Sequence, residues 1–110
     1  MIDWKRVADL RDEIGEEDFD EVVPLFLDEV SGIIETLRAG PRMDQLEEDL
    51  HFLKGSALNL GFQAFSDLCG AGEKAAAAGQ AETVNVTEIL DCFDASKTTF
   101  EVGLAEGAAA

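Results

Sequence analysis

The sequence has few basic residues. It contains 8 Lys and Arg against 24 Asp and Glu, so the formal net charge of its 110 residues is −16. Nucleic acids and anionic membranes are bound by clusters of Lys and Arg, which a chain of this composition cannot assemble over a broad surface. The shortage of positive charge therefore argues against both classes of partner.

Cysteine and histidine are also scarce. The two cysteines, Cys69 and Cys92, form no CxxC motif, and His51 is the one histidine, so a zinc site built from Cys and His would lack a fourth ligand. We therefore expect no bound metal. We also expect both cysteines to be reduced and half-buried on helices, as is typical of a protein in the cytoplasm. The N-terminus has no apolar run of signal-peptide length, and no segment approaches the roughly 18 apolar residues of a membrane span.

The remaining composition favours an all-α fold, because Ala, Leu and Glu are frequent while proline occurs twice and tyrosine is absent. Apolar residues recur at steps of three and four, as an amphipathic helix requires. The pattern predicts one domain over 1–110, with helices at 3–13, 17–40, 44–61, 62–78 and 86–104 and a frayed tail at 105–110. The four long helices should pack as an antiparallel up-down four-helix bundle, and the short extra N-terminal helix should cover one end.

Local signals indicate where the helices begin and end. Pro24 lies inside the second predicted helix, which therefore either begins near Val23 or bends there. The other signals follow known preferences for helix caps and stops. In chain order they are Gly40-Pro41 after the second helix, Asp44 with Glu47 as a capping box before the third, Gly61 after the third, Gly79 after the fourth, and Asn85 with Glu88 before the last.

The motifs of common catalytic sites are missing. The sequence contains no GxxxxGK[ST] phosphate loop, no GxSxG nucleophile elbow and no HExxH. Carboxylate pairs arise by chance in so acidic a helical chain, and a di-iron bundle needs more than one histidine. Gly70-Ala71-Gly72 is a lone GxG within a helical pattern, which favours a close contact between helices over a phosphate-binding loop.

His51 lies off the apolar face of the third predicted helix. On a wheel of about 100° per residue, it is roughly 140° from the centre of the apolar stripe, with Gly55 at roughly 180° and Leu58 at roughly 120° on the same side. Lys54 lies one turn further on, between the stripe and His51, and Glu48 lies one turn before. The stripe consists of Leu46, Leu50, Leu53, Ala57 and Leu60.

Each neighbour of the imidazole has a structural and a functional interpretation. A glycine within a helix costs about 0.5–1 kcal/mol relative to alanine, so Gly55 serves either a close helix contact or access to the imidazole. Lys54 either pairs with Glu47 or Asp49, or holds a cation near a group that becomes negative. Leu58 is either an isolated surface residue or part of a docking patch. The functional interpretations together suit a neutral imidazole nitrogen that attacks a phosphoryl group.

Residues 51–61, HFLKGSALNLG, resemble the signature HxLKGSAxxLG of histidine-containing phosphotransfer (HPt) domains at every fixed position. The segments LFLDEVSGIIETL and AAAAGQAE resemble other parts of the same family, so the similarity covers most of the chain. The resemblance implies a four-helix bundle that carries a phosphoryl group on an exposed histidine between receiver-domain aspartates. By position, it implies that His51 is phosphorylated, that Lys54 helps to neutralise the phosphoryl charge, and that Gly55 gives the receiver room.

The resemblance also implies the partners. We expect a phosphocarrier, not an enzyme and without ATP-dependent autokinase activity, in a multistep two-component phosphorelay between a hybrid histidine kinase and a response regulator. No cofactor is expected on this chain, because the Mg²⁺ of the reaction would belong to the receiver. We expect Phe52, Leu58 and Phe62 to dominate receiver binding through apolar contacts, with Glu48 beside them. The charged exterior favours a monomer.

Two alternatives are left open by the sequence. An acidic helical adaptor would use the same surface to bind a partner and would carry no phosphate. The chain could also be the phosphoacceptor domain of a larger chemotaxis-type kinase, although its initial Met and full set of helices favour a free-standing protein.

Overall fold

The computed structural model describes residues 2–107, and the all-helical fold class is confirmed for them. An isolated antiparallel bridge joins Ile2 to Phe62, and no strand is present among the described residues. The helices are α1 (Trp4–Ile14), α2 (Glu16–Ala39), α3 (Leu46–Asn59), α4 (Gln63–Ala77), the 3-10 turn η1 (Ala81–Thr83) and α5 (Val86–Ala105).

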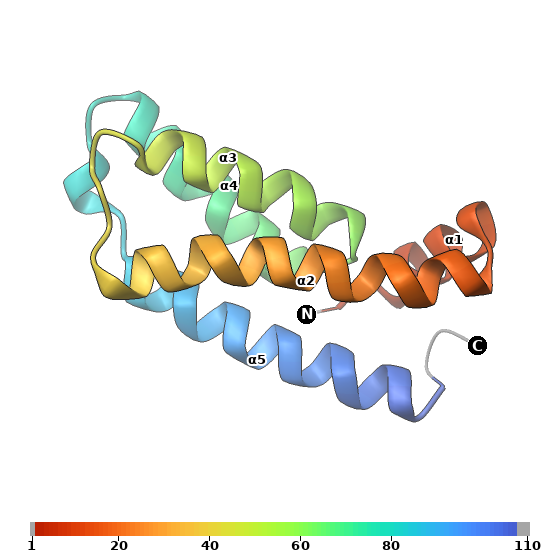
Figure 1. Ribbon diagram of the computed structural model, residues 1–110. Helices are drawn as coiled ribbons and strands as arrows, with labels where there is room; N and C mark the ends of the chain where they lie inside the picture. Colours follow the sequence, from red (N-terminus) through yellow and green to blue (C-terminus); the bar gives the residue numbers. More distant parts are fainter. Residues whose placement is uncertain (1, 108–110) are drawn as a thin grey trace.

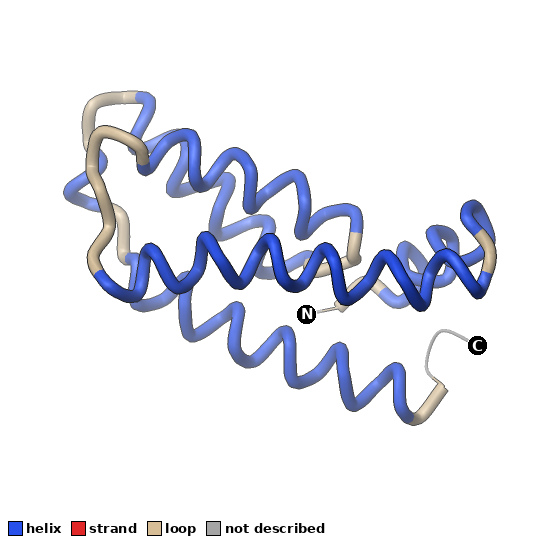
Figure 2. The backbone as a smooth tube through the Cα atoms, viewed as in Figure 1, coloured by secondary structure: helices blue, strands red, loops and turns tan. Residues whose placement is uncertain are grey.

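The helices form an elongated bundle (Figures 1 and 2). Chain direction alternates from α2 to α3, α4 and α5, and α1 lies beside the first half of α2 at one end. The described chain measures 42 × 21 × 20 Å along its principal axes. The closest pair is α3 and α4, which are joined by a short turn at Gly61.

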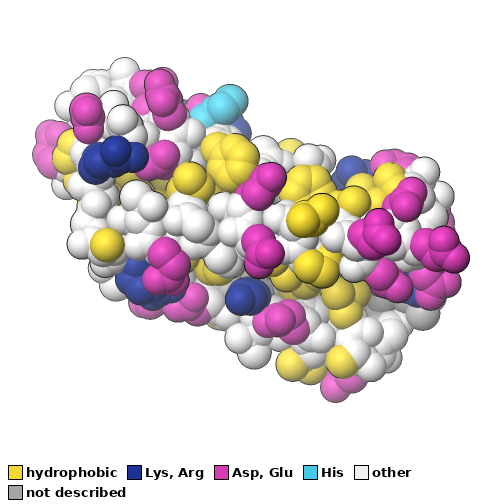
Figure 3. Space-filling view, viewed as in Figure 1, with side chains coloured by type: hydrophobic (Ala, Val, Ile, Leu, Met, Phe, Trp, Pro, Cys, Tyr) yellow, Lys and Arg dark blue, Asp and Glu magenta, His cyan; other side chains and the backbone are white. Residues whose placement is uncertain are grey.

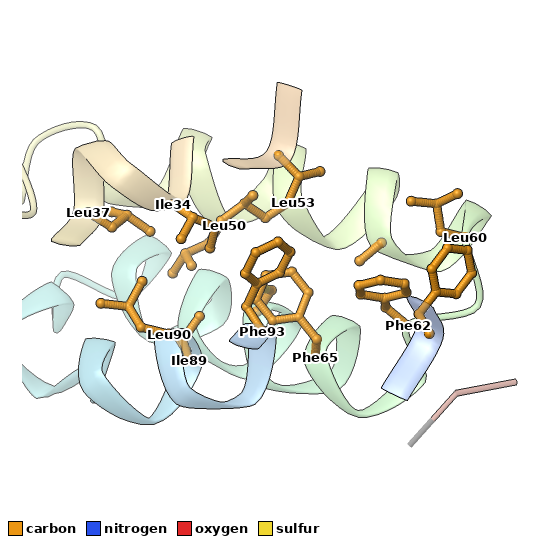
Figure 4. Packing of buried hydrophobic residues seen from close by; sticks show 14 of the residues in the cluster. Ile34, Leu37, Leu50, Leu53, Leu60, Phe62, Phe65, Ile89, Leu90 and Phe93 are labelled. Carbon is orange, nitrogen blue, oxygen red and sulfur yellow. The ribbon is translucent and has the colours of Figure 1, made fainter. Parts of the chain in front are cut away.

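The core lies mainly between the four long helices, is extended at one end by Val7 and Leu10 of α1, and consists chiefly of leucine, isoleucine, valine and phenylalanine side chains (Figure 4). Leu50 and Leu53 of α3 are completely buried in the same cluster as Phe65 and Phe93, and the rings of these two phenylalanines are 5.3 Å apart between centroids. Burying each such side chain contributes about 1.5–3 kcal/mol. The apolar stripe predicted for the third helix is therefore the face that fixes α3 in the bundle, and the opposite face is left to solvent.

Most predicted helix ends are found. Asn85 caps α5, since its side chain accepts a hydrogen bond from the backbone N–H of Glu88 at 3.0 Å. Gly61 has a φ of 77°, a left-handed conformation that glycine adopts at low cost, and this allows the chain to turn directly from α3 into α4. Helix α2 begins at Glu16 and continues through Pro24 without a break. A start near Val23 is therefore wrong.

Three details differ from expectation. The capping box at Asp44 is wrong: residues 43–45 form a turn, and α3 begins at Leu46 without a side-chain cap. Cys69 is fully buried rather than half-buried, and burial raises the pKa of its thiol to about 12. The last helix extends to Ala105, into the predicted frayed tail, of which residues 108–110 lie outside the described part.

Candidate functional site

His51 stands in the middle of α3 on its solvent side. The imidazole is 71% exposed, whereas the preceding Leu50 is completely buried. Because successive helical residues are about 100° apart, burial of the leucine stripe turns His51 outward. The exposure expected from the helical wheel is present.

A carboxylate on the neighbouring helix holds one ring nitrogen. Glu73 of α4 places Oε2 2.7 Å from Nδ1 of His51. When the carboxylate is ionised it can only accept, so Nδ1 carries the proton, and in the neutral ring Nε2 then keeps its lone pair. Among residues 2–107, Nε2 has no hydrogen-bond partner. The arrangement selects the tautomer whose free nitrogen faces solvent.

Lys54 binds the other oxygen of the same carboxylate. Its Nζ lies 2.7 Å from Oε1 of Glu73, so neither Glu47 nor Asp49 is its partner. The hydrogen bond from Lys54 is the main cause that lowers the pKa of Glu73; partial burial opposes it and the hydrogen bond with His51 adds to it. Glu73 is therefore ionised at neutral pH, as its role as acceptor from Nδ1 requires.

Glycines on α4 make this close approach possible. A Cβ at Gly72 would lie 2.8 Å from Cδ1 of Leu50, and a Cβ at Gly70 would lie 3.3 Å from Cδ of Lys54. The lone GxG is thus a close contact between helices, as predicted. Gly72 lets α4 pack against the core side of α3, and Gly70 leaves space for the aliphatic part of Lys54 on its way to Glu73.

A buried hydroxyl adds a second link between the two helices. Ser66, near the start of α4, donates a hydrogen bond to the backbone carbonyl of Lys54 at 3.2 Å. Its side chain is buried, so the bond is shielded from water and fixes the backbone of α3 one turn after His51. The backbone of α3 is thereby tied to α4 next to the imidazole.

The predicted access surface is open. A Cβ at Gly55 would meet no atom within 4 Å, so no helix contact explains this glycine. Leu58, Phe52 and Glu48 are also exposed. The prediction for Phe62 is wrong, because this ring is 1% exposed and packs 5.1 Å from the ring of Phe100.

Glu73 is the site residue that the sequence analysis missed. His51 precedes the turn at Gly61 by ten residues and Glu73 follows it by twelve. Since both helices rise by about 1.5 Å per residue, positions nearly equidistant from a tight turn lie at similar heights. Counting from Gly61 in both directions places Glu73 two residues, or about 3 Å along the axis, beyond the level of His51, which is close enough to mark it as a candidate partner.

Residues 2–107 form neither a metal centre nor a membrane span. No three His, Cys, Asp or Glu side chains are grouped so that they could hold a metal ion. No helix in this range has the length and apolar character needed to cross a membrane.

The match to a known family covers this site and most of the bundle. Residues 21–99 match the Hpt domain family, and the chain therefore belongs to it. Its members serve histidine phosphotransfer in two-component signalling as phosphocarriers rather than enzymes, and they interact with receiver domains. Comparisons with curated proteins and with solved structures gave no significant match.

Proposed function

We propose that His51 accepts a phosphoryl group from a receiver-domain aspartate and passes it to another, as the middle step of a phosphorelay between a hybrid histidine kinase and a response regulator. The observation that carries this proposal is the hydrogen bond between Nδ1 of His51 and Glu73, which leaves Nε2 as an exposed nucleophile. The open backbone at Gly55 gives a partner access to that nitrogen.

In the transfer step the lone pair of Nε2 attacks the phosphorus of an aspartyl phosphate. The P–N bond forms while the P–O bond to the aspartate breaks, and the aspartate carboxylate leaves with the electron pair. The Nδ1 proton stays on the ring, which becomes positive as the bond forms. Glu73 stabilises this positive charge at 2.7 Å, and transfer to the next aspartate reverses each step.

Lys54 supplies the local positive charge. A phosphoryl group carries about −1.5 to −2 charge at neutral pH, and Lys54 lies one turn from His51 on the same helix. In the described structure its ammonium is bound to Glu73. We propose that this ion pair holds Lys54 near the ring and that the ammonium also attracts the phosphoryl oxygens.

The remaining parts of the reaction are assigned to the partner. Phosphoryl transfer generally needs a divalent metal and further positioning groups. We propose that the receiver brings Mg²⁺, that this chain needs no cofactor, and that it does not phosphorylate itself from ATP. We further propose a monomer that acts in the cytoplasm, where thiols such as its two free cysteines normally stay reduced.

The test is phosphotransfer profiling of the chain against the phosphorylated receiver domains of its host. At least one receiver should transfer label to His51, and the product should be labile in acid and stable in base. His51→Gln should accept no label. Label retained by this variant would overturn the proposal, and so would a partner that binds both forms equally while no phosphohistidine forms in cells, which is the outcome expected of an adaptor.

A further inference from the structure

Charge is distributed unevenly along α3 on the two sides of His51. Before it, Glu47 and Glu48 are exposed in the first turn of the helix. After it, Lys54 is the last charged residue until Asp67, so residues 55–66 carry no charge. In Figure 3, acidic side chains lie beside the histidine toward the start of α3, whereas mostly uncharged atoms follow it along the rest of the helix.

The uncharged half of α3 presents a surface in line with His51. Gly55, Leu58 and Asn59 follow at spacings of four, seven and eight residues, and all three are exposed. At about 1.5 Å per residue, Leu58 lies about 10 Å from His51 along the helix axis. A standard interface of about 800 Å² per partner, roughly 30 Å across, would cover both residues.

The reaction itself decides which half a partner can cover. A donor brings the phosphoryl anion to Nε2 of His51 and an acceptor brings an aspartate carboxylate, so Glu47 and Glu48 repel the negative group of either partner on their side. Interface cores are depleted in charged residues, and the uncharged half meets this condition. A second copy of this chain is a poor occupant, because two chains of net charge −16 would repel one another.

We propose that the receiver docks asymmetrically, with its body over the surface formed by Gly55, Leu58 and Asn59 and with Glu47 and Glu48 at or beyond the rim. Leu58 is the central apolar contact. This inference rests on the proposed function and adds the orientation of the partner. It also predicts that receiver binding weakens only mildly with salt, because the contact is apolar at its centre.

The first experiment compares two matched substitutions. Leu58 is 50% exposed on α3 and Val102 is 51% exposed on α5, so Leu58→Asp and Val102→Asp add the same charge at equally exposed positions. The probe is a receiver domain found to exchange phosphate with the unaltered chain. Leu58→Asp should lower the transfer rate at subsaturating receiver by about tenfold or more, the order of a hot-spot contact, and Val102→Asp should not change it.

A second pair tests the orientation without altering packing. Asn59→Asp keeps the side-chain shape and adds a charge within the proposed contact, so transfer should fall several-fold at low salt and recover as salt screens the repulsion. Glu48→Gln removes a charge at the rim and should change transfer by about twofold or less. If Leu58→Asp and Asn59→Asp transfer at the unaltered rate, or if Glu48→Gln has the larger effect, the orientation is overturned.

A small phosphoryl donor separates this inference from the proposed function. Phosphoramidate needs no docking surface: Nε2 attacks its phosphorus and ammonia leaves. Because phosphoramidate does not contact the docking surface and a single exposed charge is largely screened by salt, all four variants should be labelled by it within about twofold of the unaltered rate, and circular dichroism should show that they are folded. Failure of the unaltered chain to accept label from any donor would refute the proposed function, whereas normal labelling with unchanged receiver transfer in the variants would refute the orientation alone.

Discussion

Helix α3 contacts α4 and α2 in different ways. Toward α4 it is linked by polar side chains, because Glu73 binds both His51 and Lys54 and Ser66 binds the backbone of α3. Toward α2, no side-chain hydrogen bond or ion pair joins the helices within residues 2–107. One buried carboxylate oxygen, Oδ2 of Asp49, lies on that flank by helical spacing without a partner in the described part of the chain.

The difference separates the chemistry of the site from its outer surface. The pair α3 and α4 fixes the tautomer of His51 and the position of Lys54 by directional bonds, which need a fixed distance between two backbones. The contact with α2 is apolar and needs only burial. We therefore expect changes between α3 and α4 to alter both stability and chemistry, and changes on the open face of α3 to alter neither chemistry nor fold.

The largest expected effect is on stability, and it comes from replacing a glycine by alanine at the contact between α3 and α4 and, for comparison, on the open face of α3. Gly72→Ala would put a Cβ 2.8 Å from Leu50 and 3.3 Å from Val84, and overpacking of this kind costs about 1–3 kcal/mol. Gly55→Ala meets no atom within 4 Å and should stabilise the helix by about 0.5–1 kcal/mol. Urea unfolding of both variants measures the two signs. Destabilisation by Gly55→Ala would show that α3 is closed on its outer face as well.

Removal of the charge on Glu73 should have the next largest effect. Glu73→Gln no longer stabilises the positive ring that forms during transfer, and its amide can also donate, so the tautomer of His51 is no longer fixed. We expect phosphoramidate labelling to slow by about tenfold, the order for loss of a charge-assisted hydrogen bond. ¹⁵N NMR should show both imidazole tautomers. Glu48→Gln is the control, since it removes an exposed acid one turn from His51 and should change labelling by about twofold or less.

The pH dependence of stability distinguishes the same two acids. Because the pKa of Glu73 is lowered in the folded chain, the stabilisation it gives is complete above its unfolded pKa of about 4.3 and is lost as pH falls through the lower folded value. The urea midpoint of the unaltered chain should exceed that of Glu73→Gln throughout the range from pH 8 to pH 5. The gap should close toward pH 3. A gap that stays open at pH 3 would mean that the ion pair is not its source.

Much of this comparison could be predicted from local sequence pattern. The leucine spacing in α3 placed Leu50 and Leu53 in the core and His51 in solvent, because a single helix suffices to define both faces. The cap at Asn85 and the turn at Gly61 were also predictable, since each depends on residues next to it in sequence. These features need no knowledge of the neighbouring helices.

What could not be predicted depends on the register and packing between elements. Glu73 becomes a site residue only when α3 and α4 pair across Gly61, and a wheel of either helix alone does not show this. Phe62 lies in the turn, where helical periodicity no longer applies, and it is buried by Phe100 of α5. Asp44 has a side chain that can cap a helix, but it lies one residue before the observed N-cap, Gln45, and therefore forms no capping box.

The smallest expected effect tests how Gly70 acts. A Cβ there would lie 3.3 Å from Cδ of Lys54, and this flexible stem can yield, so Gly70→Ala should change stability by less than about 1 kcal/mol in either direction. Gly70→Leu should displace Lys54 from Glu73 and raise the pKa of Glu73 in a ¹³C NMR titration. In a Lys54→Met background Gly70→Leu should have no further effect on the pKa of Glu73, because the substitution acts on this pKa by displacing Lys54.

The control for this cycle is an exposed glycine on another helix. Gly32 of α2 has no atom within 4 Å of an added Cβ, so Gly32→Leu should leave the Glu73 titration unchanged in both backgrounds. If Gly70→Leu shifts the titration equally with and without Lys54, the glycine acts by separating α3 from α4, and the polar flank of α3 depends on backbone distance alone. If the shift vanishes with Lys54, the space above Gly70 serves to position that one side chain.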